Sequence, residues 1–199
     1  MNQERQLGLG CVNYSIYEGA IKRYGYTGRV RDDSLKEIAD YINLTPKQLD
    51  EADSYTAKTY RAKKAFHQGN YDVEYLLVLG FLLCNHESEE KAADSLWGII
   101  NPDIASAVPT TRVLEIVDKM IYYAIDAPYE IAHADDKTDA SIKSYLEELK
   151  HRAPQLRSDV ASRFSDAQVH KNEMLMVLTP KWYGSYKIRA LVCPEKARA

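Results

Sequence analysis

Apolar residues recur at spacings of three and four along residues 88–126, a pattern that predicts two amphipathic helices joined by a short loop. The first helix is predicted from Ser88 to Ile100, and the second runs from Thr110 to Asp126. Pro102 ends the first helix, because a proline disfavours helical backbone in the residue before it. The rest of the chain is organised around this helix–loop–helix segment.

The same spacing predicts a largely helical chain on both sides of this segment. Further helices are predicted over residues 13–23, 34–42, 45–64, 74–84, 139–152, 155–164 and 167–178, with a short helix or strand around Tyr186–Leu191. The 74–84 helix is apolar nearly all round, so it must be buried in the domain or against a partner. Residues 1–33 contain five of the nine glycines and four tyrosines, which suggests an interface-forming arm with little core of its own or a mobile tail.

Composition is that of a soluble globular protein of 199 residues. The formal net charge of −3 offers no electrostatic footprint for nucleic acid or an anionic membrane. The longest apolar run, residues 75–84, is far short of the roughly 20 residues needed to span a bilayer, so no membrane insertion is expected. Three scattered cysteines favour a reducing compartment, and Cys84 is most simply a small core residue.

The loop after residue 100 has the length and the residue spacing of a calcium-binding EF-hand loop. If Asn101 is position 1, then Val108 stands at the apolar position 8 and Trp97 four residues before the loop. The stretch SEEKAADSLWGII resembles the first helix of calmodulin-like and neuronal-calcium-sensor-like proteins. The chain is therefore similar to the EF-hand superfamily over about residues 45–126.

The calcium ligands of such a loop are mostly missing. Only Asn101 and Asp103 could supply oxygen, as weak metal candidates, whereas Arg112 stands where a bidentate Glu belongs. An Asn-Pro-Asp turn whose side chains bond to the backbone explains the same residues. We therefore predict no metal and no cofactor.

A second loop lies at the distance expected for an EF-hand pair. With Gly69 at position 6, Tyr71 takes the apolar position 8 and Tyr60 matches Trp97. The resemblance implies that Tyr71 and Val108 pair across the two loops. The ligand positions of this loop are also lost.

Two other constellations suggest different chemistry. Residues 34–57 resemble a helix-turn-helix DNA-binding unit, although the acidic second helix would repel phosphates. His133, Asp135 and Asp136 are a possible metal cluster, but a solvated turn explains them more simply. No phosphate loop, dinucleotide fingerprint or nucleophile elbow is found, and we predict that the chain is not an enzyme.

The predicted fold is therefore all-α: a degenerate EF-hand pair followed by a C-terminal helical extension. The expected divisions are a Tyr/Gly-rich arm at 1–33, the pair with inactive loops at 34–126, and the extension and tail at 127–199. The resemblance implies an apolar cleft that grips a helix or peptide of another protein. The expected partner-binding residues are Tyr14, Tyr17, Tyr24, Leu77, Phe81, Trp97, Trp182, Tyr183 and Tyr186.

The preferred functional hypothesis is a non-catalytic structural or adaptor subunit of a larger protein assembly. Degenerate EF-hand proteins occur in ciliary microtubule assemblies and as accessory subunits of mitochondrial complexes. The absence of a presequence pattern favours the cytoplasm or cilium over the mitochondrion. The alternatives are a calcium-regulated sensor with one non-standard site, and a helix-turn-helix nucleic-acid-binding module. The oligomeric state stays open.

Overall fold

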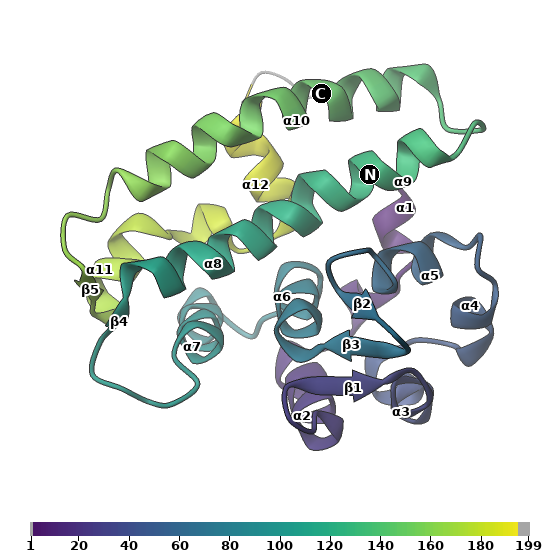
Figure 1. Cartoon of the computed structure of the whole chain (residues 1–199), viewed down its shortest axis with the longest axis horizontal. Helices are drawn as coiled ribbons and strands as arrows, with labels where there is room; N and C mark the ends of the chain where they lie inside the picture. Colours follow the sequence, from purple (N-terminus) through teal and green to yellow (C-terminus); the bar gives the residue numbers. More distant parts are fainter. Residues whose placement is uncertain (1, 195–199) are drawn as a thin grey trace. The chain divides into compact units, whose positions relative to one another are not determined.

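The computed structural model of the chain describes residues 2–194 and is predominantly helical, which confirms the prediction at this coarse level (Figure 1). Small antiparallel sheets accompany the helices, so the chain is not purely α-helical. It divides into two compact units, Met1–Ser88 (unit 1) and Glu89–Ala199 (unit 2). This division falls within the stretch 34–126 that was expected to form one EF-hand-like pair.

Unit 1 consists of short helices around a three-stranded sheet with the order β1-β3-β2. Its elements are α1 (Asn2–Arg5), η1 (Leu9–Cys11), α2 (Tyr14–Tyr24), β1 (Arg29–Arg31), α3 (Asp32–Glu37), η2 (Ala39–Ile42), α4 (Pro46–Asp50), α5 (Tyr55–Tyr60), β2 (Phe66–His67), β3 (Asn70–Asp72) and α6 (Val73–Leu83).

The sheet of unit 1 joins two similar helix–strand–helix segments, α2–β1–α3 and α5–β3–α6. Val30 faces Tyr71, and the pairing of β1 with β3 is symmetric about these two residues. Each strand follows a residue and then a glycine with positive φ: Thr27 and Gly28 before β1, Gln68 and Gly69 before β3. The glycines suit this left-handed backbone because they have no Cβ. Unit 1 is therefore built from two related halves.

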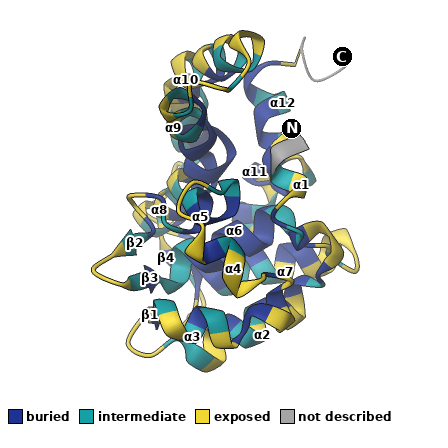
Figure 2. Ribbon diagram, turned by 90° about the vertical axis from the view of Figure 1, so that its right-hand side faces the viewer, coloured by how far each residue is buried: buried dark blue, intermediate teal, exposed yellow. Residues whose placement is uncertain are grey.

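Helix α2 belongs to the core of unit 1, so the prediction that residues 1–33 have little core of their own is wrong. Tyr14, Tyr17 and Ile21 are at most 1% exposed, and α2 packs against α6. Asn13 caps α2 by accepting a hydrogen bond from the Ser15 amide. Helix α6 is buried along most of its length, as its uniformly apolar sequence predicts (Figure 2).

The predicted helix over residues 45–64 is two short helices, α4 and α5. Ser54 starts α5 by accepting a hydrogen bond from the Ala57 amide, and its hydroxyl donates to the Gln48 carbonyl. A residue that caps a new helix breaks the preceding one, and apolar spacing alone does not show this. Residues 34–57 therefore lack the two continuous helices of a helix-turn-helix unit.

Unit 2 is built from longer helices and one two-stranded sheet. Its elements are α7 (Glu89–Ile100), β4 (Val108–Pro109), α8 (Thr110–Ile121), the π-helical segment η3 (Tyr122–Asp126), α9 (Ala127–Ala134), α10 (Ala140–Ala161), β5 (Gln168–Val169), α11 (Lys171–Val177), η4 (Pro180–Trp182) and α12 (Ser185–Val192).

The sheet of unit 2 pairs Val108 with Val169, so the predicted pairing of Tyr71 with Val108 is wrong. Each apolar strand residue pairs inside its own unit: Tyr71 with Val30, and Val108 with Val169. The predicted helix 167–178 begins only at Lys171, because the two residues of β5 belong to this sheet. Unit 2 thus also contains two helix–strand–helix segments, α7–β4–α8 and α10–β5–α11.

Helix α10 continues through Pro154, where two separate helices were predicted. Its buried residues Leu146, Leu149, Ala153 and Val160 keep helical spacing on both sides of the proline. Burial of this stripe offsets the roughly 3 kcal/mol that an internal proline costs. The proline itself is exposed.

Candidate functional site

The loop between α7 and β4 is held by Asn101 through its own backbone contacts. The Asn101 side chain accepts a hydrogen bond from the Ala105 amide at 2.9 Å and donates to the Ala105 carbonyl at 2.7 Å. Asn101 is only 5% exposed, whereas Asp103 is exposed. The structure therefore does not bring these two metal candidates together as ligands, and the geometry matches the turn alternative.

Arg112 links the second helix of this segment to the end of the first. Its guanidinium donates to the carbonyl of Ile100 at 3.1 Å and to that of Ile99 at 3.0 Å. These carbonyls lie at the C-terminal end of α7, where a positive charge is stabilised by the helix dipole. A third contact, 3.4 Å to Glu115, keeps the guanidinium in place. A protein cation therefore occupies the place where the loop comparison puts a calcium-binding carboxylate.

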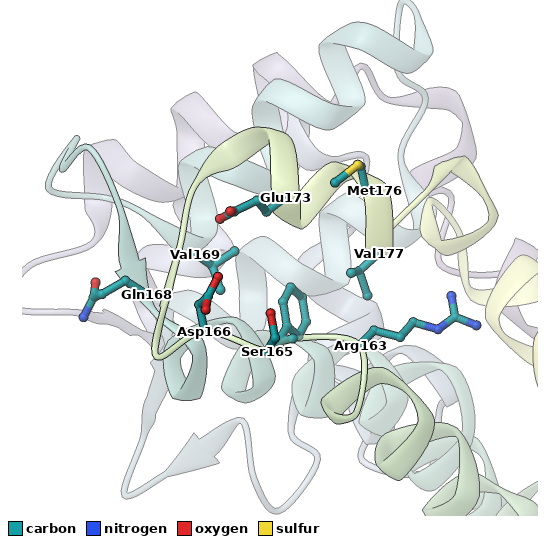
Figure 3. A pocket seen from close by; sticks show the side chains of 9 residues that line it. Arg163, Ser165, Asp166, Gln168, Val169, Glu173, Met176 and Val177 are labelled. Atoms are coloured by element: carbon teal, nitrogen blue, oxygen red, sulfur yellow. The ribbon is translucent and has the colours of Figure 1, made fainter.

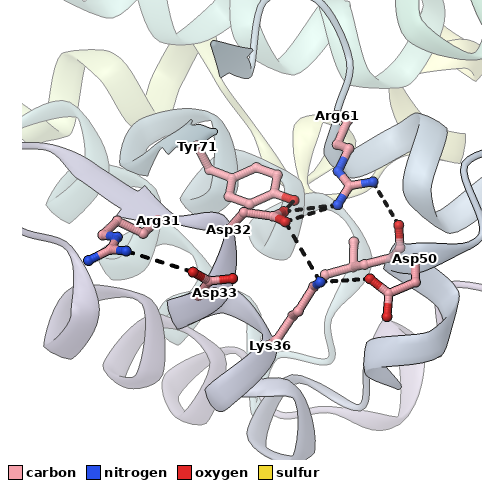
Figure 4. Close-up of polar contacts among 8 residues, drawn as sticks. Arg31, Asp32, Asp33, Lys36, Asp50, Arg61 and Tyr71 are labelled. Atoms are coloured by element: carbon pink, nitrogen blue, oxygen red, sulfur yellow. Dashed lines mark hydrogen bonds and ion pairs between the residues drawn. The ribbon is translucent and has the colours of Figure 1, made fainter. Parts of the chain in front are cut away.

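Asp32 is the centre of a polar cluster in unit 1 (Figure 4). Arg61 donates to both of its carboxylate oxygens at 3.0 and 3.1 Å, and the Tyr71 hydroxyl donates to it as well. Lys36 bridges Asp32 and Asp50, with the closer contact of 2.6 Å to Asp50. The cluster ties the first helix–strand–helix segment of unit 1 to the second.

Electrostatics favour this arrangement of charges. Burial, and then the hydrogen bond to Asp32, raise the pKa of Tyr71 well above its ordinary value, so the phenol stays a donor. The hydrogen bond to Asp50 raises the pKa of Lys36. Arg61 also donates to the Leu49 carbonyl at 2.7 Å, near the end of α4. The cluster is a structural tie with its charges paired.

A pocket of about 370 Å³ lies beside α11 in unit 2 (Figure 3). Apolar residues line part of it, with Met176 74% exposed, and charged residues line the rest. The lining consists of Arg163, Phe164, Ser165, Asp166, Gln168, Val169, Glu173, Met176 and Val177. Glu173 accepts a hydrogen bond from the His170 amide at 2.8 Å and so caps α11. An apolar surface with a charged rim is suited to a protein segment that carries apolar side chains.

The candidate cluster at His133 is a local structural contact. The His133 ring bonds to the Tyr129 carbonyl at 2.9 Å and to Glu147 at 3.0 Å, while Asp135 accepts from the Lys137 amide. Within residues 2–194, no group of three or more His, Cys, Asp or Glu side chains is placed to hold a metal ion. No helix in this part of the chain is long and apolar enough to cross a bilayer.

The expected partner-binding residues fall into two groups. The buried group consists of Tyr14, Tyr17, Leu77, Phe81, Trp182 and Tyr183. A side chain buried in its own chain is not presented to a partner. Tyr24 and Trp97 are half-buried and Tyr186 is 64% exposed, so these three stay surface candidates.

Sequence reasoning missed the buried carboxylate of Asp126. This residue is 4% exposed and contacts Lys150 at 2.7 Å and Arg157 at 2.9 Å, both from α10. Arg189, also buried, donates to the Ala124 carbonyl at 3.1 Å. The available signal was a single acid at the end of the apolar run YYAID. These contacts hold η3 against α10 and α12.

Comparison of the chain with protein-family models, curated proteins and solved structures finds no match.

Proposed function

We propose that the chain is a non-catalytic structural or adaptor subunit of a larger protein assembly, built from two degenerate EF-hand-like pairs. Each unit contains two helix–strand–helix segments joined by a short antiparallel sheet. Each sheet contains one apolar pair, Val30 with Tyr71 and Val108 with Val169, as in the loops of paired EF-hands. The proposal therefore places one pair in each unit, in place of the single pair expected over residues 45–126.

The observation that carries the proposal is the role of Arg112. Its guanidinium bonds to the carbonyls of Ile99 and Ile100, so a fixed positive charge ties α8 to α7. A bidentate carboxylate at this position would make the same link only through calcium. In unit 1, Arg61 links the two halves through Asp32 in a comparable manner. The relative positions of the paired helices would then not depend on calcium.

We expect the stability and conformation of the chain to be the same with and without calcium. A ligand that binds only the folded state stabilises it by about 2.7 kcal/mol at 100 times its Kd, so binding would be plain in a melting curve. The test is thermal unfolding and tryptophan emission in chelator and in millimolar calcium, with no change expected. Arg112→Ala should lower stability by about 1–3 kcal/mol through its lost hydrogen bonds, whereas Arg29→Ala, at an exposed position, should not.

A calcium-dependent rise in melting temperature or a shift in emission would contradict the proposal. It would favour the alternative of a calcium-regulated sensor.

The surface that suits an adaptor is the pocket beside α11. Met176 is flexible and polarizable, which suits it to contact with a partner's apolar side chains. We expect the native chain to elute from an extract of its own cells well above its mass of 22.7 kDa, with or without chelator. Met176→Glu should release it to lower mass, while Met176→Leu should not. Elution of the unmodified chain as a free monomer would contradict the adaptor role.

A further inference from the structure

Ile104 is the most exposed of the large hydrophobic residues in the described part of the chain. It is 90% exposed and lies in the loop between α7 and β4. Its φ of 55° places a β-branched side chain in left-handed backbone, which is a genuine outlier. Such strain persists only where the surrounding structure imposes it.

Hydrogen bonds hold the loop around Ile104 in place. The buried Asn101 bonds to both backbone groups of Ala105, and its carbonyl accepts a hydrogen bond from the Ile104 amide at 3.3 Å. Arg112 fixes the end of α7 immediately before the loop. Ile104 is therefore presented to solvent on a preorganised support, which lowers the entropy cost of a contact made there.

A small apolar notch lies on the outer face of α2 in unit 1. It measures about 140 Å³ and is lined by Ile16, Gly19, Ala20, Arg23, Tyr24 and Tyr41. Ile16 and Tyr41 are more than half exposed, so the notch is surrounded by apolar surface. A space of about 150 Å³ in a protein holds one benzene-sized apolar group. The notch therefore fits a single branched aliphatic side chain.

Charge distinguishes Ile104 from the other exposed apolar residues as an occupant of this notch. Asp103 precedes Ile104, and Arg23 lines the notch, so the two charges are complementary. Tyr26 and Tyr186 are also exposed, but Tyr26 pairs with Arg29 across a β-bridge and Tyr186 precedes Lys187, and the Arg23 guanidinium would repel both cations. Met176 has apolar neighbours on both sides.

We propose that Ile104 of one copy of the chain inserts into the α2 notch of a second copy, with Asp103 beside Arg23. The two surfaces are different, so the contact is head-to-tail and leaves a free Ile104 and a free notch at the ends of every oligomer. The chain would then add copies in rings or filaments. This inference uses neither the pocket beside α11 nor the calcium independence of the loops.

The first test is the dependence of mass on concentration, measured for the full chain by light scattering or sedimentation. A contact of this small size is weak, so we expect association that grows into the millimolar range. Ile104→Asn removes the apolar group with a residue that tolerates left-handed backbone, and should weaken association by about tenfold or more. Gly19→Leu should do the same by filling the notch, since a Cβ at Gly19 meets nothing within 4 Å.

Mixing the two variants gives the sharpest result. The Ile104→Asn copy keeps its notch and the Gly19→Leu copy keeps its Ile104, so together they should form a dimer that does not grow further. Asp103→Arg and Arg23→Asp should each weaken association and restore it when combined in one chain. Tyr26→Ser, at another exposed large apolar residue that lies outside both proposed contact surfaces, is the control and should associate normally.

A chain that stays monomeric into the millimolar range would overturn the proposal. So would association that Gly19→Leu and Ile104→Asn leave unchanged, or a mixture of the two variants that forms no dimer. Because Met176→Glu tests the adaptor proposal separately, failure of either proposal can be recognised without the other.

Discussion

Cys84 follows the last residue of α6 as a buried free thiol. Burial raises the pKa of this thiol from 9.0 to about 12, because a thiolate is poorly solvated there. The folded protein therefore retains a proton that the unfolded chain releases near its ordinary pKa. The contribution to stability is fully present below pH 9 and is lost as the pH rises from 9 toward 12.

We expect the free energy of unfolding to fall by about 1.4 kcal/mol per pH unit above pH 9 on account of this one group. Urea unfolding between pH 8.5 and 10 measures the slope before the buried tyrosines contribute strongly. Cys84→Ala should flatten the slope, whatever it does to stability at pH 7. Cys11→Ala, which removes an exposed thiol, should leave the slope unchanged, and an equally steep slope in Cys84→Ala would refute this account.

At the level of single residues, the sequence predicted which side chains are buried better than it predicted which side chains contact one another. The assignment of Cys84 to the core is confirmed, because an apolar helix end determines it locally. The ion pairs of Asp126 were not predictable, since its cations come from α10, 24 and 31 residues further along the chain. Tyr14 and Tyr17 of α2 were expected at an interface but are buried in the core, because a tyrosine serves a core and a surface equally well.

Between elements, the contact of α2 with α6 depends on Gly80. A Cβ at this position would lie 2.3 Å from the ring of Tyr17, which is fully buried. Helix α6 has little room to yield, because it is buried along most of its length. The close approach of the two helices therefore requires a residue without a side chain.

Gly80→Ala should destabilise the chain by about 1–3 kcal/mol, the usual cost of overpacking a core. Gly98→Ala is the matched control, because Gly98 lies inside α7 and its Cβ would meet nothing within 4 Å. Alanine there should be neutral or stabilise by up to about 1 kcal/mol. Urea unfolding of both variants checks the comparison, and equal effects would show that helix propensity, not packing, decides at Gly80.

Helical elements were predictable where the apolar spacing is strong and uninterrupted. The 74–84 and 88–100 segments appear as α6 and α7 within a residue. The errors lie in the predicted helix boundaries. Pro154 was predicted to end a helix, although α10 continues through it, and Ser54 was not recognised as the N-cap of α5. In both places tertiary burial or a side-chain cap outweighed the local preference.

For the whole molecule, the sequence predicted that the loops containing Tyr71 and Val108 pair with each other, but these loops belong to different units. Loop 64–74 and loop 101–112 have related patterns, but their strands pair with β1 and β5. Those partner loops carry weaker signals, since the first contains Arg29-Val30-Arg31 and the last Gln168-Val169 within a predicted helix. The local sequence pattern identified the helix–strand–helix segments. It could not show which strands pair, because strand pairing depends on contacts between residues far apart in the chain.

The π-helical segment η3 sets the rotational phase between α8 and α9. A π-turn accommodates one residue more than an α-turn, and an α-helix advances about 100° per residue. Because the extra residue is absorbed within the π-turn, deletion of one residue between Tyr122 and Asp126 would let α8 and α9 merge into one regular helix with little change of phase. If the full run were instead wound as a regular α-helix, everything after it would turn by about 100°, and Asp126 would swing away from Lys150 and Arg157. The π-helical winding of this run, and not only its composition, is therefore under constraint.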